Sequence, residues 1–298
     1  MTPPAPASGV PETARPRRAA VLGHPVAHSL SPVLHAAAYE LLGLPWRYEP
    51  VDVTEDALVG FLAGLDESWV GLSLTMPLKK RVLPLVSSLD EVAAATGSAN
   101  TVLWRGQGVG RTAHGFNTDV AGIVAALTED DGAAAALDVD GAVVLGAGAT
   151  AASAIAALAQ LGASRATVLV RSVERAAGLR EVASRLDVVL DVRTLDAWAD
   201  VAPRAGVVVS TLPGGAADGL ATQVRAARGA FLDVAYAQRP TRLGAAWRTA
   251  GGSYVSGERM LLHQAVAQVR LFVESTGVVL DDVSAVTATM DEALQPHL

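Results

Sequence analysis

Cysteine is absent from this chain of 298 residues, so neither a disulfide framework nor a cysteine-ligated metal site can form. Aromatic residues make up only 4%, the net charge is -7, and the basic residues are scattered, which argues against nucleic-acid binding. No apolar run approaches the roughly 18 residues of a membrane span. The first 16 residues are rich in Pro and Ala and lack the apolar segment of a signal peptide. We therefore expect a disordered tail over residues 1–17 and a soluble, cytoplasmic protein with neither nucleic-acid nor membrane partners.

Lysine and asparagine are nearly absent as well. Of the 23 basic residues only two are lysines, Lys79 and Lys80, and the only asparagines are Asn100 and Asn117, each followed by Thr. An ammonium group can lose its proton near neutral pH when its surroundings favour this, whereas a guanidinium cannot. The pattern predicts a catalytic or substrate-binding lysine after the strand that ends at Thr75, and two amides kept for hydrogen bonding. The alternatives are two solvated charges and two asparagines that form turns or caps.

The length predicts about two domains, and the hydrophobic share of 51% supplies their cores. Two alternating strand–helix series predict an α/β fold with two largely parallel sheets covered by helices. We place a substrate domain at residues 18–118, a Rossmann-type domain at 119–255, and C-terminal helices at 256–298 that return to the first domain. In the first series Ser31 is the predicted N-cap of a helix with Pro32 at its first position. The strands are expected at 19–23, 46–53, 69–75, 98–104, 108–115, 141–145, 165–170, 188–192, 206–210, 229–234 and 253–256.

A glycine-rich turn opens the second series. Gly146, Gly148 and Ala151 fit the G-x-G-x-x-G/A dinucleotide fingerprint, between a predicted strand and a predicted helix. The first glycine allows the tight turn, and the second lets the backbone approach a pyrophosphate at the helix N-terminus. In a chain rich in Gly and Ala the motif alone is weak, but the strand–helix–strand context supports a nucleotide site.

The end of the next strand bears on the choice of cofactor. An NAD site usually carries a carboxylate there, whereas this strand ends in Val170-Arg171-Ser172, with Arg175 one turn later. Two guanidinium groups suit a 2′-phosphate, so the sequence favours NADP. The alternative is an ordinary charged helix start, which Ser172 would cap.

Polar side chains gather at or just after the predicted strand ends of the first domain. Ligands of open α/β sheets bind outside the carboxyl ends of the strands. Hydroxyl, amide, ammonium and carboxylate groups that converge there suit a small polyol acid. The side chains are Ser29, Ser31, Thr75, Lys79, Asn100, Asn117 and Asp119.

In their order and spacing these motifs resemble the shikimate dehydrogenase family over nearly the whole chain from Arg18. The resemblance rests on Ser29-Leu30-Ser31-Pro32, Ser73-Leu74-Thr75-Met76-Pro77-Leu78-Lys79, Gly97-Ser98-Ala99-Asn100-Thr101, Asn117-Thr118-Asp119, the loop and clamp of residues 146–151 and 170–175, Tyr236, Gly257, Met260-Leu261 and Gln264. The chain departs from the family pattern at Ser73, where the family has Asn, at Ala149, where it has a second loop Gly, and at Val170, where it has Asn.

The resemblance implies reversible, NADPH-dependent reduction of 3-dehydroshikimate to shikimate in aromatic amino-acid biosynthesis, by a monomer or homodimer without a metal. It implies that Lys79 and Asp119 form the catalytic acid–base pair. The implied substrate-binding residues are Ser29, Ser31, Thr75, Asn100, Gln264 and Tyr236. The implied NADP-binding residues are Gly146, Ala147, Gly148, Ala149, Thr150, Arg171, Ser172, Arg175, Thr211, Gly257 and Met260.

Three other interpretations remain open. A dehydrogenase of quinate or of amino-substituted analogues shares this chemistry, although Ser31 argues for shikimate over quinate. A methylenetetrahydrofolate dehydrogenase–like enzyme also joins a lysine-bearing domain to a Rossmann domain, but the serine pair and the two Asn-Thr motifs disfavour it. A non-enzymatic NADP-binding regulator predicts an eroded catalytic pair, whereas Lys79 and Asp119 are both present.

Overall fold

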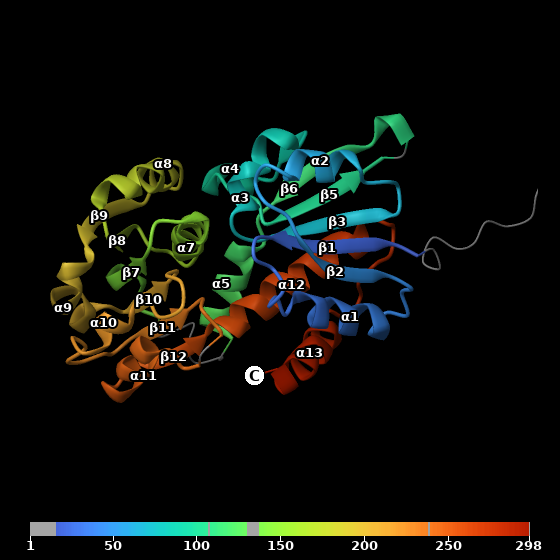
Figure 1. The fold of residues 1–298 in the computed structure, drawn as a ribbon. Coiled ribbons are helices and arrows are strands. Elements are labelled where there is room, and N and C mark those ends of the chain that lie inside the picture. Colours follow the sequence, from blue (N-terminus) through green and yellow to red (C-terminus); the bar gives the residue numbers. More distant parts are fainter. Residues whose placement is uncertain (1–15, 107, 130–136, 238, 298) are drawn as a thin grey trace, which may run out of the picture.

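The computed structural model describes residues 16–106, 108–129, 137–237 and 239–297. Most of the predicted tail at residues 1–17 lies outside these residues. The described chain forms two six-stranded sheets, each covered by helices (Figure 1). No helix in these ranges has both the length and the apolar character needed to cross a bilayer.

The first sheet has the strand order β2-β1-β3-β5-β6-β4. Strand β1 pairs in parallel with β2 and β3, and β6 with β4, but β5 is antiparallel to both β3 and β6. Among the described strands of this sheet only β5 runs opposite to the others, so the prediction of a largely parallel sheet is confirmed with this one exception. The connection between β5 and β6 spans only residues 106–111, and a link so short can join only antiparallel neighbours. The strands are β1 (Arg18–Gly23), β2 (Arg47–Asp52), β3 (Trp69–Leu74), β4 (Ser88–Leu89), β5 (Thr101–Arg105) and β6 (Thr112–Phe116).

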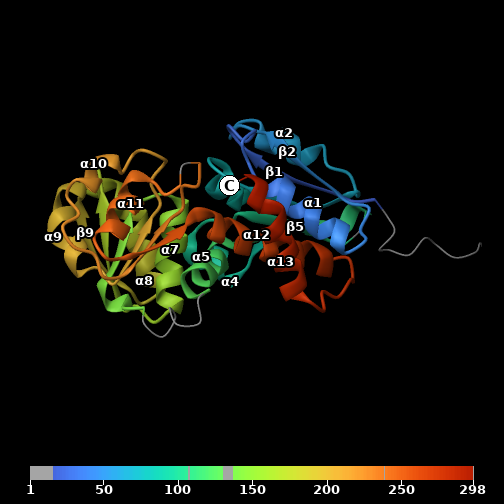
Figure 2. The same ribbon diagram turned by 90° about the horizontal axis from the view of Figure 1, so that it is seen from below.

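Two C-terminal helices complete the first half of the molecule, after the chain has already passed through the second half (Figure 2). Helix α12 (Gly257–Glu274) approaches β3 so closely that a Cβ on Gly71 would lie 2.1 Å from the ring of Phe272. Helix α13 (Val283–Leu294) packs with α1 (Ser31–Leu41) in one apolar cluster. The remaining helices of this half are α2 (Leu58–Ala63), α3 (Leu78–Arg81) and α4 (Glu91–Thr96).

The second sheet is wholly parallel, in the order β12-β11-β10-β7-β8-β9. This is a Rossmann-type arrangement, and the order reverses between β7 and β10, the point at which such sheets bind ligands. The strands are β7 (Ala142–Leu145), β8 (Arg165–Val170), β9 (Val189–Thr194), β10 (Val207–Ser210), β11 (Ala230–Asp233) and β12 (Ser253–Ser256). The helices are α7 (Ala149–Gln160), α8 (Ala177–Arg185), α9 (Trp198–Val201), α10 (Asp218–Ala221) and α11 (Arg242–Thr249).

Helix α5 (Asp119–Thr128) connects the halves and packs against both α12 and α7. It is strongly apolar because it is covered on two sides: Val120, Ile123 and Leu127 are all buried. Its first residue, Asp119, lines one pocket together with residues of both halves.

Two predicted helix caps are wrong. Ser31 is the first residue of α1, and Leu30 occupies the cap position without a side-chain hydrogen bond. Ser172 precedes a 3₁₀ turn, and its hydroxyl donates to the carboxylate of Glu174 instead of accepting from the backbone. A serine hydroxyl has several local partners to choose from, so its presence before a helix does not ensure capping.

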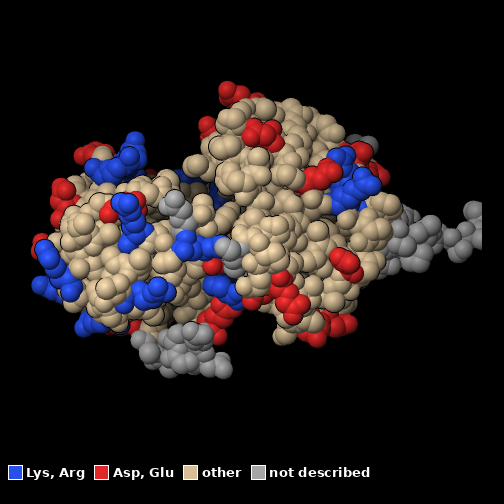
Figure 3. All heavy atoms as spheres, turned by 60° about the horizontal axis from the view of Figure 1, so that its bottom comes forward, with Lys and Arg blue, Asp and Glu red and all other residues tan. Residues whose placement is uncertain are grey.

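Charged side chains do not merge into a large patch of one sign on the face in Figure 3, where basic and acidic groups alternate among uncharged atoms.

Candidate active site

A pocket of about 340 Å³ lies where the two halves meet. All eight residues predicted to bind or act on the substrate line it, and so do Thr150, Gly257 and Met260 from the predicted cofactor set. The eight are Ser29, Ser31, Thr75, Lys79, Asn100, Asp119, Tyr236 and Gln264.

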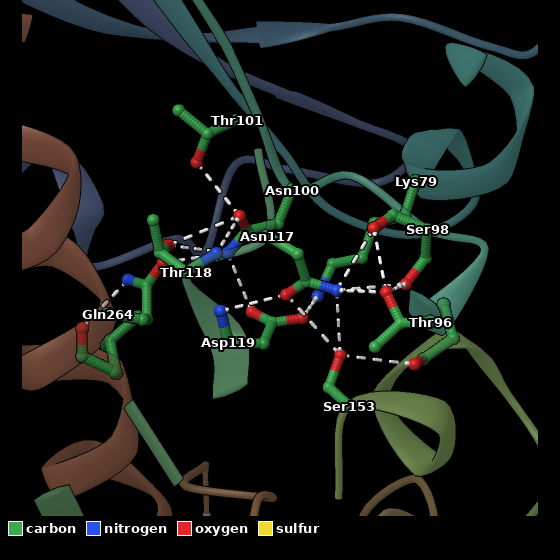
Figure 4. Close-up of polar contacts among 12 residues, drawn as sticks. Lys79, Thr96, Ser98, Asn100, Thr101, Asn117, Thr118, Asp119, Ser153 and Gln264 are labelled. Atoms are coloured by element: carbon green, nitrogen blue, oxygen red, sulfur yellow. Dashed lines mark hydrogen bonds and ion pairs between the residues drawn. The ribbon is translucent and has the colours of Figure 1, made fainter. Parts of the chain in front are cut away.

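Lys79 and Asp119 form a nearly buried ion pair in this pocket. The Lys79 Nζ lies 2.6 Å from Asp119 Oδ2, and the side chains are 14% and 4% exposed. The second carboxylate oxygen, Oδ1, accepts a hydrogen bond of 2.8 Å from Asn100 Nδ2. Figure 4 shows the three side chains meeting between the strands of the first sheet and α5. The carboxylate thus has a donor on each oxygen, which fixes its position relative to the ammonium group.

The turn after β3 brings Lys79 to the pocket. The N–H of Leu78 donates to Thr75 O at 2.8 Å, and the side chain of Leu78 is fully buried and anchors the short helix α3. The neighbouring strand end is tied in as well, because His24 N donates to Met76 O at 3.0 Å. Lys80, one residue on, is exposed and does not line the pocket.

Asn100 is held by the backbone of the next motif. Its Oδ1 accepts 2.8 Å hydrogen bonds from Thr118 N and from Thr101 Oγ1. Gln264 approaches from α12, with its Oε1 3.5 Å from Asn100 Nδ2, and its own amide donates to Leu261 O at 2.8 Å. Asn100 therefore has its carbonyl directed at the backbone and its amino group directed into the site.

Asn117 does not reach the pocket, although the sequence grouped it with the other polar strand-end residues. Its Nδ2 faces Thr96 Oγ1 and Ser98 on one side and Ser153 Oγ of α7, 3.1 Å away, on the other (Figure 4). Its Oδ1 accepts from Asp119 N at 3.1 Å. Asn117 thus lies behind the pocket, between the residue pair and the helix that follows the glycine-rich loop.

Burial changes the titration of several groups near the pocket. Burial raises the pKa of the Tyr236 hydroxyl, so this group enters the site as a hydrogen-bond donor. Burial likewise raises the pKa of Tyr48 and lowers the pKa of His35 to about 3, so that this imidazole is neutral.

Two polar residues that line the pocket, Ser73 and Gln268, were not predicted as site residues from the sequence. Gln268 lies one helical turn after Gln264 on α12, and this i, i+4 spacing was the one available signal that both amides face the same way. Ser73 was noted only as a departure from a family pattern.

The glycine-rich loop has the geometry that its motif predicts. Gly146 has φ +114°, and a Cβ there would lie 2.5 Å from the hydroxyl oxygen of Thr211. Thr211 in turn donates from N and Oγ1 to Leu145 O, each at 2.8 Å. A Cβ on Gly148 would meet nothing within 4 Å, so open space lies over the loop at the N-terminus of α7. The backbone there is free to approach an anionic group.

Arg171 and Arg175 are exposed at the end of β8, beside this loop, and do not line the pocket. In the described ranges neither guanidinium forms an ion pair. Glu174, which lies between them, has its pKa lowered by the hydrogen bond from Ser172. The two arginines therefore present charge to solvent where a 2′-phosphate would extend from a nucleotide on the loop.

Of the residues that the structure describes, no three or more His, Asp or Glu side chains gather closely enough to hold an ion.

Comparisons with known proteins agree with this geometry. Residues 21–102 match the family model of the shikimate dehydrogenase substrate binding domain. The shikimate dehydrogenase (NADP(+)) of Trichormus variabilis is 33% identical over 298 residues, which cover 96% of this chain and 98% of that protein. The crystal structure of Mycobacterium tuberculosis shikimate dehydrogenase is similar with a TM-score of 0.81 and 38% identity, covering 94% of this chain and 99% of that chain.

A third relative is the Thermus thermophilus shikimate 5-dehydrogenase, solved in complex with NADP(H) and shikimate. It has a TM-score of 0.74 and 32% identity, and covers 93% of this chain and 100% of that chain. Similarity of this extent, over nearly the full length of both chains, establishes that the protein belongs to the shikimate dehydrogenase family.

Proposed function

We propose that the protein is an NADP-dependent shikimate dehydrogenase that reversibly reduces 3-dehydroshikimate to shikimate. The observation that carries the proposal is the Lys79–Asp119 pair, 2.6 Å apart and further bonded by Asn100, in a pocket that residues of both halves line. The related Thermus enzyme, whose structure contains NADP(H) and shikimate, supports the same substrate and cofactor.

Lys79 would supply the proton that the reaction needs. Reduction of a ketone places negative charge on its oxygen, and an ammonium group in a nearly buried site can stabilise that charge and transfer a proton to it. Asp119 holds the ammonium group in place, and in the oxidation direction it stabilises the lysine as it regains its proton. Asn100 fixes the carboxylate through Oδ1.

The remaining polar groups of the pocket would bind the substrate. Ser29 lies on the loop before α1, Ser31 begins α1, Thr75 follows β3, Gln264 comes from α12 and Tyr236 from the loop after β11. Hydroxyl and amide groups from five separate elements suit a ring that carries a carboxylate and several hydroxyls.

The cofactor would lie along the loop of residues 146–150, where the open space over Gly148 fits a pyrophosphate at the N-terminus of α7. Arg171, Ser172 and Arg175 would hold the 2′-phosphate. Thr211, Gly257 and Met260 would hold the end of the cofactor nearest the pocket, which Gly257 and Met260 line. When bound, NADPH supplies the hydride.

We further infer the division of the chain into a substrate domain (18–118 with 256–298) and a Rossmann domain (119–255). The return of α12 and α13 to the first sheet supports it. A cytoplasmic location, and a state of monomer or homodimer, remain part of the same proposal.

The activity is tested with purified protein, NADP⁺ and shikimate, by following absorbance at 340 nm, with quinate and NAD⁺ as competing substrate and cofactor. We expect turnover with shikimate and NADP⁺. Lys79→Ala should lower kcat by roughly 10²–10⁴-fold because it removes the proton donor. The exposed neighbour provides the matched control, since Lys80→Ala should leave kcat unchanged. Absence of turnover by the wild type, or equal effects of the two substitutions, would refute the proposal.

A further inference from the structure

A continuous chain of side-chain hydrogen bonds runs from β2 to the catalytic carboxylate through Gln268. Its first links are Tyr48 Oη to Ser73 Oγ at 2.7 Å and Ser73 Oγ to Gln268 Oε1 at 2.8 Å. Gln268 Nε2 then donates to Thr101 Oγ1 at 3.0 Å. Thr101 Oγ1 donates to Asn100 Oδ1, and Asn100 Nδ2 to Asp119 Oδ1, both at 2.8 Å. All six side chains are buried.

The direction of this chain is fixed at its Asp119 end. Asn100 Oδ1 lies 2.8 Å from Thr118 N, and a backbone N–H can only donate, so this atom must be the amide oxygen. The amino group of Asn100 therefore faces the carboxylate. Since Asn100 Oδ1 also takes the hydroxyl proton of Thr101, the Thr101 oxygen must accept from its other neighbour.

The direction is fixed at Gln268 as well. Gln268 Nε2 lies 3.4 Å from the backbone oxygen of Asn100, which can only accept, so this end of the amide is the donor. The carbonyl end consequently faces Ser73 and, at 3.4 Å, His35 Nε2. Ser73 must then donate to Gln268 and accept from Tyr48, whose hydroxyl keeps its proton because burial raises its pKa.

Gln268 has no hydrogen-bonding capacity left for a pocket occupant. Its two N–H groups face Thr101 Oγ1 and the Asn100 backbone oxygen, and its carbonyl accepts from Ser73 and faces His35. It lines the pocket, yet every polar atom that it could offer to a substrate is already engaged. A buried amide whose groups are all paired holds its neighbours in one arrangement, since any rotation leaves polar atoms unpaired.

We propose that Gln268 is a positioning residue that acts through Thr101 to keep the amino group of Asn100 directed at Asp119. This inference rests on the proposed function of the Lys79–Asp119 pair. The substitution Gln268→Met keeps a side chain of similar length and removes both donors. Thr101 then has no donor on its oxygen, and the orientation of its own proton toward Asn100 is no longer enforced.

The test is a double-mutant cycle in kcat/KM for shikimate with Gln268→Met, Thr101→Val and the double variant. Each single variant should lose between about 10- and 100-fold, as expected when a catalytic group is displaced slightly. The double variant should lose no more than the larger single loss, because both substitutions break the same chain. KM for NADP⁺ should stay at the wild-type value. Thr287→Val removes a hydroxyl that donates to Val283 O within α13 and lies outside the hydrogen-bonded chain, so it should leave kcat/KM unchanged.

Additive losses in the cycle would overturn the proposal, and so would full activity of Thr101→Val beside a defective Gln268→Met, which would mean that Gln268 binds substrate directly. A crystal structure of Gln268→Met gives a readout independent of turnover: we expect the 2.8 Å contact between Asn100 Nδ2 and Asp119 Oδ1 to lengthen or break. An unchanged contact refutes the positioning role even if the wild type has no activity with shikimate. An inactive wild type with a displaced Asn100 in the variant would refute the proposed function alone.

Discussion

Lys79 and Lys80 are neighbours in the chain but have different surroundings. The first is held at 2.6 Å from Asp119 in the pocket, whereas the second is exposed outside it. The scarcity of lysine marked both residues equally, and only the motif distinguished between them. A rare residue type thus points to a short stretch of chain, while burial and partners decide which residue in that stretch is used.

His35 should make the protein sensitive to mild acid. Burial lowers the pKa of His35 to about 3 from its usual 6.5. As the pH falls from 6.5, the unfolded chain binds a proton that the folded state excludes, so the free energy of unfolding decreases. The loss is at most about 1.4 kcal/mol per pH unit. His35→Phe keeps an aromatic ring for the stack on Tyr48, whose centroid lies 3.8 Å away, and removes this titration.

Urea unfolding at pH 7, 6 and 5 provides the measurement for this prediction. The His35→Phe variant should be less stable than the wild type at pH 7, because Tyr39 loses a hydrogen-bond partner, but its stability should depend less on pH. Tyr39→Phe is the matched control, because it removes the same hydrogen bond but keeps the imidazole, and its stability should keep the wild-type dependence on pH. A slope in His35→Phe equal to that of the wild type would contradict the buried, neutral state of this imidazole.

Whether a site residue could be predicted depends on how far along the chain its hydrogen-bond partners lie. Asn100 and Asp119 were found because each belongs to a short motif of polar residues. Ser73, in contrast, bonds to partners 25 and 195 positions away, within strands and a helix that read as ordinary apolar segments. Such pairing depends on how whole elements pack, which local patterns do not encode.

At the scale of elements, Ser153 joins α7 to the first half of the molecule through its contact with Asn117. This serine is fully buried among alanines, and its Oγ lies 3.1 Å from Asn117 Nδ2. We expect Ser153→Ala to lower the free energy of unfolding by only about 0.5–1.5 kcal/mol, because Asn117 keeps Thr96 and Ser98 as acceptors. Asn117→Ala should lower the free energy of unfolding by more, since it leaves the buried N–H of Asp119 without its acceptor.

Chemical denaturation of the two variants gives this order directly. Thr128→Val is the matched control, because among the described residues the Thr128 hydroxyl donates just to Val124 O, within its own helix. If Ser153→Ala lowers the free energy of unfolding by more than Asn117→Ala does, the contact between the halves depends on the serine and not on the amide.

Most elements were predictable because they repeat one pattern: a short apolar strand, a turn, and an amphipathic helix. The exceptions have physical causes. Strand β4 has only two residues, too few for any periodicity, and was missed. The antiparallel direction of β5 depends on the length of its connection to β6, which apolar periodicity does not report. The predicted N-caps at Ser31 and Ser172 were wrong because a serine hydroxyl can form hydrogen bonds with several neighbouring groups other than the helix N–H groups.

At the scale of the whole molecule, the first half is built from two distant parts of the chain. Its apolar cluster joins α1 and strands β1 and β2 to α12 and α13, which follow the entire second sheet. The two clusters of the second half contain no residue of α13. The first half therefore cannot complete its core until the end of the chain has been made, whereas the second half depends little on that end.

In a chain that ends at Gly277, the first half of the molecule should become much less stable than the second half. This chain lacks Leu280, Val286, Met290 and Leu294, all buried against the first half. At about 1.5–3 kcal/mol for each buried apolar side chain, the loss is about 6–12 kcal/mol. This is comparable to the entire stability of a typical domain, about 5–15 kcal/mol. We expect limited proteolysis with mass spectrometry to show rapid cleavage in residues 18–118 and protection of the second sheet. A chain that ends at Leu294 is the control and should resist cleavage throughout, because the described residues that it lacks, 295–297, are exposed. Equal protection of both sheets in the shorter chain would mean that α13 is dispensable, and equal cleavage would mean that the two halves unfold together.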